Sequence, residues 1–237
     1  GEKLGKSMYD VIPGIVRGDR QDVTVGSPEE VIKPGAADIV VVCTNSFTKD
    51  VYDKLVFVME RGMNVITSAE EMAYPKAKEP ELTKKLDEYA KKNGVSVMGT
   101  GINPGLIMDL LVVLWTAACE EVNHITSRRV NSLSPFGPAV MEEQGIGMPV
   151  EEFNRRKADG TMAGHVGFAE STMMICDALG WKWDSFGQDM EPIVTDVDRK
   201  SPYGFAAKGT VAGVAMKGWV DIDGERKLDM EHPQQIE

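Results

Sequence analysis

The chain has 237 residues, of which 42% are hydrophobic and 27% are charged, as is usual for a globular protein with a substantial core. Its formal net charge of -11 argues against a nucleic-acid partner, because phosphate backbones attract basic surfaces. No apolar stretch approaches the roughly 18 residues that a membrane span needs, so we expect no membrane partner.

The cysteines and histidines argue against a disulfide framework and against a metal centre. Cys43, Cys119 and Cys176 are odd in number and widely spaced, which suits a reducing cytoplasm. The chain has only three histidines, too few for a His-rich metal site. We therefore expect a metal-free protein of the cytoplasm.

The two ends of the chain lack the features of a complete domain. The sequence begins with Gly1 in a polar stretch that no strand precedes, and it ends on "MEHPQQIE" after a strand-like segment. Either both ends are loops, or the sequence is an internal piece of a longer protein.

The first half of the chain alternates between strands and helices. Continuous apolar residues predict buried strands at 38–43, 64–67 and 95–101, and helical spacing predicts helices at 48–61 and 80–92. Strands alternating with helices through short links are typical of right-handed crossovers. We predict a parallel sheet with helices on both faces.

The pattern changes from Asn103 onward. The predicted elements are an apolar helix over 103–119 with Pro104 in its first turn, a half-buried strand over 122–132, a loop rich in Gly, Pro and Met over 134–149, helices near 150–157 and 168–179, and antiparallel strands over 192–199 and 209–223. This second half is a mixed α+β unit, and we place the boundary between the two units near residue 103.

Small polar residues or glycines follow three strands of the predicted sheet. They are "CTNSF" at 43–47, "TSAEE" at 67–71 and "GTGINPG" at 99–105. Ligands of open parallel sheets bind outside the carboxyl ends of the strands, and although such loops are often polar for structural reasons, three in succession favour a cofactor crevice. A G-x-G-x-x-G fingerprint is missing, because no strand precedes "GEKLGK". Pro104 in the first turn of a helix would direct free amide groups back toward this crevice.

Two adjacent glutamates end the second of these motifs. Ser68 and Glu71 have the spacing of a capping box, in which the two side chains satisfy backbone amides at a helix start. Glu70 has no such partner and stands at the mouth of the crevice. From the residues alone, a solvated partner of the helix dipole and a chemical role are equally open for Glu70.

The second half contributes two further candidates. Arg128 and Arg129 fall on opposite faces of a strand, so one of them points inward, where a ligand carboxylate or an internal ion pair could meet it. His165 stands in a glycine-rich loop before a helix, as a substrate ligand or as a satisfied turn residue. We interpret Glu170, in the first turn of that helix, as a dipole partner.

Several motifs together resemble one family. "NVITSAEEMAYP", "GTGINPG", "RRV" and "GHVGFAES" followed by "DALGW" occur in the order found in 2,4-diaminopentanoate dehydrogenases of ornithine fermentation and the native amine dehydrogenases. More loosely, the chain is similar to dihydrodipicolinate reductase and homoserine dehydrogenase. The resemblance implies an α/β fold with a partial Rossmann-type parallel sheet, whose first βαβ unit with its glycine fingerprint is missing. It also implies an N-terminally incomplete dinucleotide-binding domain over 1–103, a C-terminally incomplete α+β substrate and oligomerisation domain over 104–237, and a homo-oligomer, such as a dimer.

The resemblance further implies an enzyme of amino-acid catabolism that uses NAD or NADP. Such an enzyme oxidatively deaminates 2,4-diaminopentanoate, or a related amine, to 2-amino-4-oxopentanoate and ammonia. The catalytic glutamate of the family matches Glu70. By the same resemblance, Arg129 and His165 would bind the carboxylate and the 2-amino end of this small-molecule substrate. The residues expected to line the cofactor are Thr44, Asn45, Ser46, Thr67, Thr100, Gly101 and Asn103.

Two other functions stay open. A relative of homoserine dehydrogenase or dihydrodipicolinate reductase would reduce a carbonyl group without ammonia. That group typically has a lysine where Glu70 stands, which counts against this reading. A non-catalytic, nucleotide-sensing domain is the second alternative, and the missing fingerprint favours it.

Overall fold

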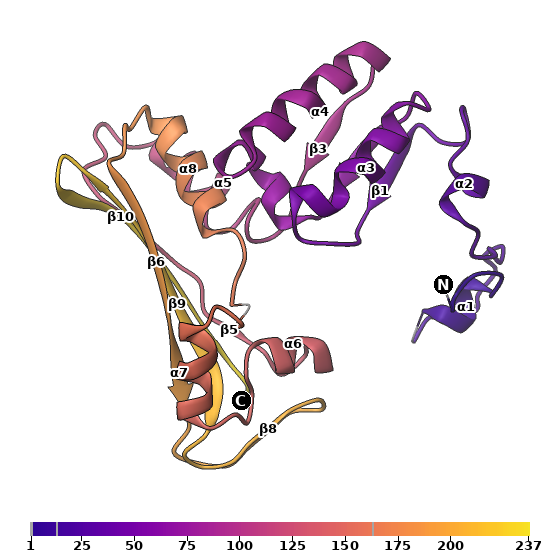
Figure 1. Ribbon diagram of the computed structural model, residues 1–237. Coiled ribbons are helices and arrows are strands. Elements are labelled where there is room, and N and C mark those ends of the chain that lie inside the picture. The colour runs from indigo at the N-terminus through magenta and orange to yellow at the C-terminus, as the bar shows by residue number, and fades with distance from the viewer. Residues whose placement is uncertain (1, 13, 163) are drawn as a thin grey trace.

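The strands of the protein gather into two main sheets (Figure 1). A computed structural model describes residues 2–12, 14–162 and 164–237. One sheet has three strands in the order β1-β2-β3, and the other has five, in the order β4-β10-β9-β6 with β5 beside β10. Within the described ranges, no helix has the length and apolar character to cross a membrane.

The three-stranded sheet is parallel, as predicted. It contains β1 (Ile39–Val42), β2 (Asn64–Thr67) and β3 (Val97–Gly99). Helix α3 (Thr48–Met59) connects the first two strands, and α4 (Pro80–Asn93) connects the last two. The α/β order read from the sequence is therefore confirmed.

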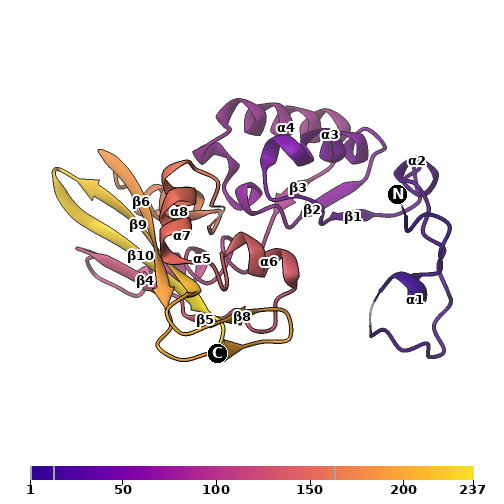
Figure 2. The same ribbon diagram turned by 60° about the horizontal axis from the view of Figure 1, so that its bottom comes forward.

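Both connecting helices cover the same face of this sheet (Figure 2). Val42 and Val65 of the sheet pack with Leu55 of α3 and Leu86 of α4 in one buried cluster. On the opposite face most side chains are exposed, among them Val41 at 63%. The prediction of helices on both faces is wrong for the described chain, because two successive right-handed crossovers in one direction place their helices on one side.

The segment before β1 lies beside the sheet and is mostly exposed (Figure 1). It contains two single-turn helices, α1 (Met8–Val11) and α2 (Pro28–Val31). A capping box formed by Ser27 and Glu30 starts α2. No described residue of this segment lines the site discussed below.

The five-stranded sheet supports the second hydrophobic core. Phe168 and Ile175 of α8 pack against Val214 and Met216 of β9, together with residues of α5, α7 and β10. The elements of this half are β4 (Ile125–Arg128), β5 (Asn131–Ser132), α7 (Val150–Ala158), α8 (Phe168–Leu179), β6 (Ser185–Val194), β7 (Arg199–Lys200), β8 (Phe205–Ala206), β9 (Val211–Ile222) and β10 (Glu225–Gln235). The helices near 150–157 and 168–179 and the strand over 209–223 match the predictions. The strand predicted over 192–199 is misplaced, because β6, which pairs antiparallel with β9, begins at Ser185 and ends at Val194.

Strand β10 was not predicted, although it lies in the middle of its sheet. It pairs antiparallel with β9 and parallel with β4 and β5. Pro233 hides this strand in the sequence, because proline cannot donate to a sheet ladder. In the structure Pro233 falls in the gap between β4 and β5, whose pairing with β10 stops at Glu231 and resumes at Gln234.

Two further predictions for the second half are wrong. Helix α5 spans only Leu110–Thr116, with Asp109 as its N-cap, and turns occupy residues 103–109. Buried Asp109 accepts hydrogen bonds from the amides of Gly105 and Leu110 and from the Ser171 hydroxyl, so it ends the turns and starts the helix. Pro104 therefore lies outside the helix. The expected loop over 134–149 contains helix α6 (Pro138–Glu143), whose Met141 packs in a small buried cluster.

Candidate active site

A cavity of about 310 Å³ lies where the two halves of the chain meet. Five of the predicted site residues line this central cavity: Ser46, Glu70, Asn103, Arg129 and His165. They come from the ends of β1, β2, β3 and β4 and from the loop before α8. The structure thus brings the predicted catalytic residue and both predicted substrate residues into one site.

A smaller pocket of about 210 Å³ lies at the carboxyl ends of β1 and β2. Cys43, Thr44, Asn45, Ser46, Ser68 and Glu70 line this strand-end pocket, and Ser46 and Glu70 also line the central cavity. The Lys54 ammonium group of α3 donates to Thr44 Oγ1 at 2.9 Å and to Asn45 Oδ1 at 2.7 Å, which fixes both side chains. The two hollows therefore share a wall at Glu70.

The other predicted cofactor residues stabilise the turns that follow β2 and β3. Thr67 is fully buried, and its hydroxyl accepts a hydrogen bond from the Ala69 amide at 3.1 Å. The Thr100 amide donates to the Thr67 carbonyl at 2.9 Å. Gly101 lies under Pro104, whose carbonyl oxygen would be 2.6 Å from an added Cβ. None of Thr67, Thr100 and Gly101 lines either hollow.

Glu70 begins a short 3₁₀ helix, η1 (Glu70–Ala73), directly after β2. This turn sits against the end of β3, where a Cβ at Gly99 would lie 1.8 Å from the Met72 carbonyl oxygen. Only glycine permits such a close approach of two backbones. The Glu70 side chain is half-buried, and no hydrogen bond or ion pair joins it to the described residues.

The capping box predicted for Ser68 and Glu71 is wrong. The N-cap of η1 is Ala69, and no side chain caps it. Glu71 is buried, and its Oε2 accepts a hydrogen bond at 2.8 Å from the amide of Thr48, the first residue of α3. The carboxylate therefore caps a different helix, at a point distant in sequence, and this leaves Glu70 free to face the cavity.

Glu170 has a larger role than the dipole partner that we expected. It is fully buried in α8, and burial raises the pKa of its carboxyl group above the usual range. The Lys78 ammonium group lies 3.5 Å from Glu170 Oε1 and 3.6 Å from Glu71 Oε1. This cluster of Glu71, Lys78 and Glu170 joins the turn that carries Glu70 to the second half of the chain.

Arg129 is the inward-pointing member of the arginine pair. Arg128 lies on the outer side and forms an ion pair with Glu231 at 3.2 Å. Arg129 is half-buried and lines the central cavity, and burial lowers the pKa of its guanidinium group. No ion pair joins Arg129 to any residue in the described part of the chain, so its charge is available to a ligand carboxylate.

Two neutral histidines stand beside Arg129. His165 Nε2 lies 3.1 Å from Asn103 Nδ2, and the His165 ring packs edge-to-face on His232 with the ring centroids 4.8 Å apart. Burial and the nearby Arg129 charge lower the pKa of His165 to about 4, and burial, His165 and Arg129 lower that of His232 to about 3. Both rings are therefore neutral near pH 7. His232 Nδ1 and Asn103 Oδ1 are buried and have no hydrogen-bond partner among the described residues.

Sequence reasoning missed several residues of this site because they lie on elements that it did not predict. His232 and Gln234 belong to β10, and Glu143 and Gln144 belong to or follow α6. Gln234 Nε2 donates to Gln144 Oε1 at 3.1 Å, which joins the two elements. Predicting either element would have required knowledge of its tertiary contacts, which are the neighbouring strands for β10 and the small buried cluster around Met141 for α6.

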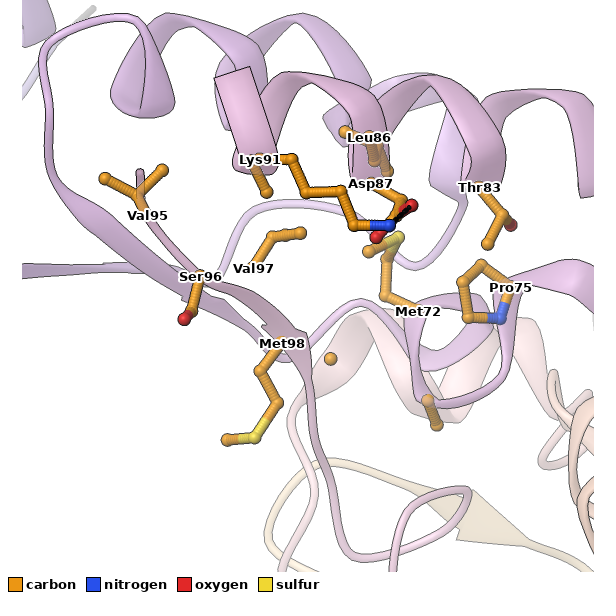
Figure 3. Close-up of a pocket in the computed structure, with 13 residues that line it drawn as sticks. Met72, Pro75, Thr83, Leu86, Asp87, Lys91, Val95, Ser96, Val97 and Met98 are labelled. Atoms are coloured by element: carbon orange, nitrogen blue, oxygen red, sulfur yellow. Dashed lines mark hydrogen bonds and ion pairs between the residues drawn. The ribbon is translucent and has the colours of Figure 1, made fainter. Parts of the chain in front are cut away.

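A larger hollow of about 480 Å³ lies elsewhere, between α4, β3 and the turn at 72–75 (Figure 3). Met72, Leu86 and Val97 make its walls mostly apolar. Its charged residues, Asp87 and Lys91, point at each other in Figure 3 and form an ion pair of 2.6 Å. Since these charges neutralise each other and no predicted site residue lines the hollow, the smaller central cavity is the better candidate site.

The overall fold matches that of a solved dehydrogenase. Amine dehydrogenase from Mycobacterium smegmatis superimposes with a TM-score of 0.78 over 100% of this chain and 69% of that chain, at 22% sequence identity. This likeness shows the fold, a parallel sheet with a pocket at the carboxyl ends of its strands, where the ligands of such sheets bind.

The particular family follows from sequence similarity. Residues 106–237 match the family model described as the 2,4-diaminopentanoate dehydrogenase C-terminal domain. The 2,4-diaminopentanoate dehydrogenase of Acetoanaerobium sticklandii is 66% identical over 100% of this chain and 67% of its own length. The chain belongs to the 2,4-diaminopentanoate dehydrogenase family, and it spans about two thirds of the length of this relative.

Replacing Glu71 should destabilise the protein. Glu71→Ala leaves the buried Thr48 amide without its acceptor and removes one of the two carboxylates that Lys78 reaches, so we expect the free energy of unfolding to fall by about 1–3 kcal/mol. Denaturant unfolding measures the change. Glu79→Ala is the matched control, since Glu79 pairs with the exposed Lys49 and its loss should matter less. Equal effects of the two substitutions would contradict the role assigned to Glu71.

The neutral histidines should make stability fall in mild acid. Their pKa values in the folded protein lie below the unfolded value near 6.5, so the unfolded chain binds protons first as the pH falls. Each histidine should cost about 1.5 kcal/mol of stability between about pH 6.5 and pH 5. Unfolding curves recorded across this range, for the natural protein and for His232→Gln, measure the effect. We expect a flatter pH dependence for the variant, and an unchanged slope would show that His232 is not responsible.

Proposed function

We propose that this chain carries out the NAD(P)-dependent oxidative deamination of 2,4-diaminopentanoate or a closely related amine. The observation that carries the proposal is the central cavity, where Glu70 and Arg129 face the same space without ion-pair partners in the described chain. Membership of the 2,4-diaminopentanoate dehydrogenase family supports the reaction type.

The reaction converts the amine, water and the oxidised cofactor into the ketone, ammonia, the reduced cofactor and a proton. A hydride, that is, a proton with two electrons, leaves C4 of the substrate, and water then replaces nitrogen at that carbon. Glu70 would take the proton from the ammonium group that reacts and would assist the attacking water. Its negative charge would also stabilise the iminium cation of the substrate. Arg129 would hold the substrate carboxylate, and the neutral His165 would contact the 2-amino end.

The strand-end pocket fits the nicotinamide end of a dinucleotide. Hydroxyl and amide side chains line it, and it shares Glu70 with the central cavity. Thr44, Asn45 and Ser46 would contact the cofactor directly, and the Asn103 turn would bound it on the substrate side. The nicotinamide, when bound, accepts the hydride. The cofactor is NAD or NADP.

Three features of the whole enzyme belong to the same proposal. We infer a division near residue 103 between a dinucleotide-binding domain and a substrate domain, in line with the separate sheets on either side of that position. Resemblance to the family supports a homo-oligomer, such as a dimer. Three scattered cysteines, none of them in a disulfide, are compatible with a cytoplasmic enzyme.

A coupled assay tests the activity. The full-length enzyme should reduce NAD+ or NADP+ when 2,4-diaminopentanoate is added, and it should release one ammonia for each cofactor reduced. Absorbance of the reduced nicotinamide and an enzymatic ammonia assay measure the two products. Cofactor reduction with a hydroxy acid instead of the diamino acid would favour the carbonyl-reducing relatives, and no turnover of any diamino acid would refute the proposal.

Removing the Glu70 charge should abolish turnover with little loss of stability. Glu70→Gln keeps the size of the side chain but cannot accept the proton, so kcat should fall by about 10²–10⁴-fold. Because Glu70 forms no ion pair in the described chain, the midpoint of thermal unfolding should hardly change. Glu71→Gln serves as the neighbouring control and should lower stability more than kcat. The reverse pattern would show that the two roles are exchanged.

A further inference from the structure

Three charged residues line the central cavity: Glu70, Arg129 and Glu143. None of them forms an ion pair with any residue that the structure describes. Their direct neighbours in sequence are satisfied elsewhere, since Glu71 pairs with Lys78 and Arg128 pairs with Glu231. With both histidines neutral, the cavity has two negative groups and one positive group.

Such a set of charges suits a ligand that has two positive groups and one negative group. Glu70 and Arg129 are half-buried, and a partly desolvated charge is costly unless a group of opposite sign comes close to it, whereas Glu143 is exposed at the edge of the cavity. The substrate of the proposed function has two ammonium groups and one carboxylate near pH 7, so each group finds one counterpart in the cavity. Glu70 would face the amine that reacts, and Arg129 would face the carboxylate. The 2-ammonium group, which does not react, still needs a negative partner.

We propose that Glu143 binds the 2-ammonium group of the substrate and thereby selects diamino acids over simple amines that carry a carboxylate. This inference rests on the proposed function and names a specificity-determining residue for it. Glu143 is the remaining negative group in the wall of the cavity as the structure describes it.

The fold holds Glu143 where this role requires it. Glu143 is the last residue of α6, and Met141 of that helix is buried with Leu133 and Ile236. The next residue, Gln144, is buried, and its Nε2 donates to the Gly164 carbonyl at 3.4 Å, next to His165. These contacts fix the end of α6 against the loop that carries His165. Glu142 is exposed, as Glu143 is, but it does not line the cavity, so it offers a control at the adjacent position.

Two substrates and three variants test the assignment in the full-length enzyme with its nicotinamide cofactor. The substrates are 2,4-diaminopentanoate and 4-aminopentanoate, which lacks only the 2-amino group. We expect Glu143→Gln to lower kcat/KM for 2,4-diaminopentanoate by about tenfold or more, mainly through KM, because it removes one charge pair at the rim of a pocket. For 4-aminopentanoate kcat/KM should change less than about threefold. Glu142→Gln should change neither value, and Glu143→Asp, which keeps the charge, should retain part of the preference for the diamino acid.

The remaining outcomes separate the inference from the function on which it rests. Equal losses on both substrates in Glu143→Gln would assign Glu143 a structural role and overturn the inference, with the proposed function intact. An unchanged preference for the diamino acid would overturn it as well. Absence of turnover by the natural enzyme with both substrates would overturn the proposed function, and the assignment of Glu143 with it.

Discussion

The buried carboxylate of Glu71 is the contact on which the site depends. One of its oxygens caps the start of α3, and the other faces Lys78, which also reaches the buried Glu170 of α8. Two buried carboxylates without a counter-charge would be costly, so Lys78, which reaches both, compensates them. The cluster therefore fixes the turn after β2 to its own sheet and to the second half of the chain.

The central cavity exists because of that connection. Glu70 lies next to Glu71 and so points into the space between the halves, where Arg129 and His165 arrive from the other side. The charged groups of the Glu71 cluster are paired with one another. The acidic and basic groups that line the cavity, in contrast, have no ion-pair partners in the described chain. Glu71 and Glu70 are adjacent in sequence and differ in function because one is held by the protein and the other is left for a ligand.

The errors of the sequence analysis share one cause, which is that local patterns were assigned local partners. Ser68 and Glu71 have capping-box spacing, yet the actual partner of Glu71 is the Thr48 amide, 23 positions away. No strand was predicted over β10, whose Pro233 occupies a gap in the ladder that only the arrangement of β4 and β5 creates. Asp109, whose partners include Ser171 at a distance of 62 positions, moves the start of α5 beyond Pro104.

The sequence by itself determined the parallel β1–β3 unit, the helices α3, α4, α7 and α8, and the family. Apolar periodicity and the glycines that end helices act over a few residues, so they can be read without coordinates. Only the tertiary structure decided which side chains share the cavity. Glu143, His232 and Arg129 come together because β10 inserts between β4 and β9 and because α6 packs at the end of that sheet. Such contacts join residues about a hundred positions apart, and a charge pattern along the chain does not show which groups remain unpaired after folding.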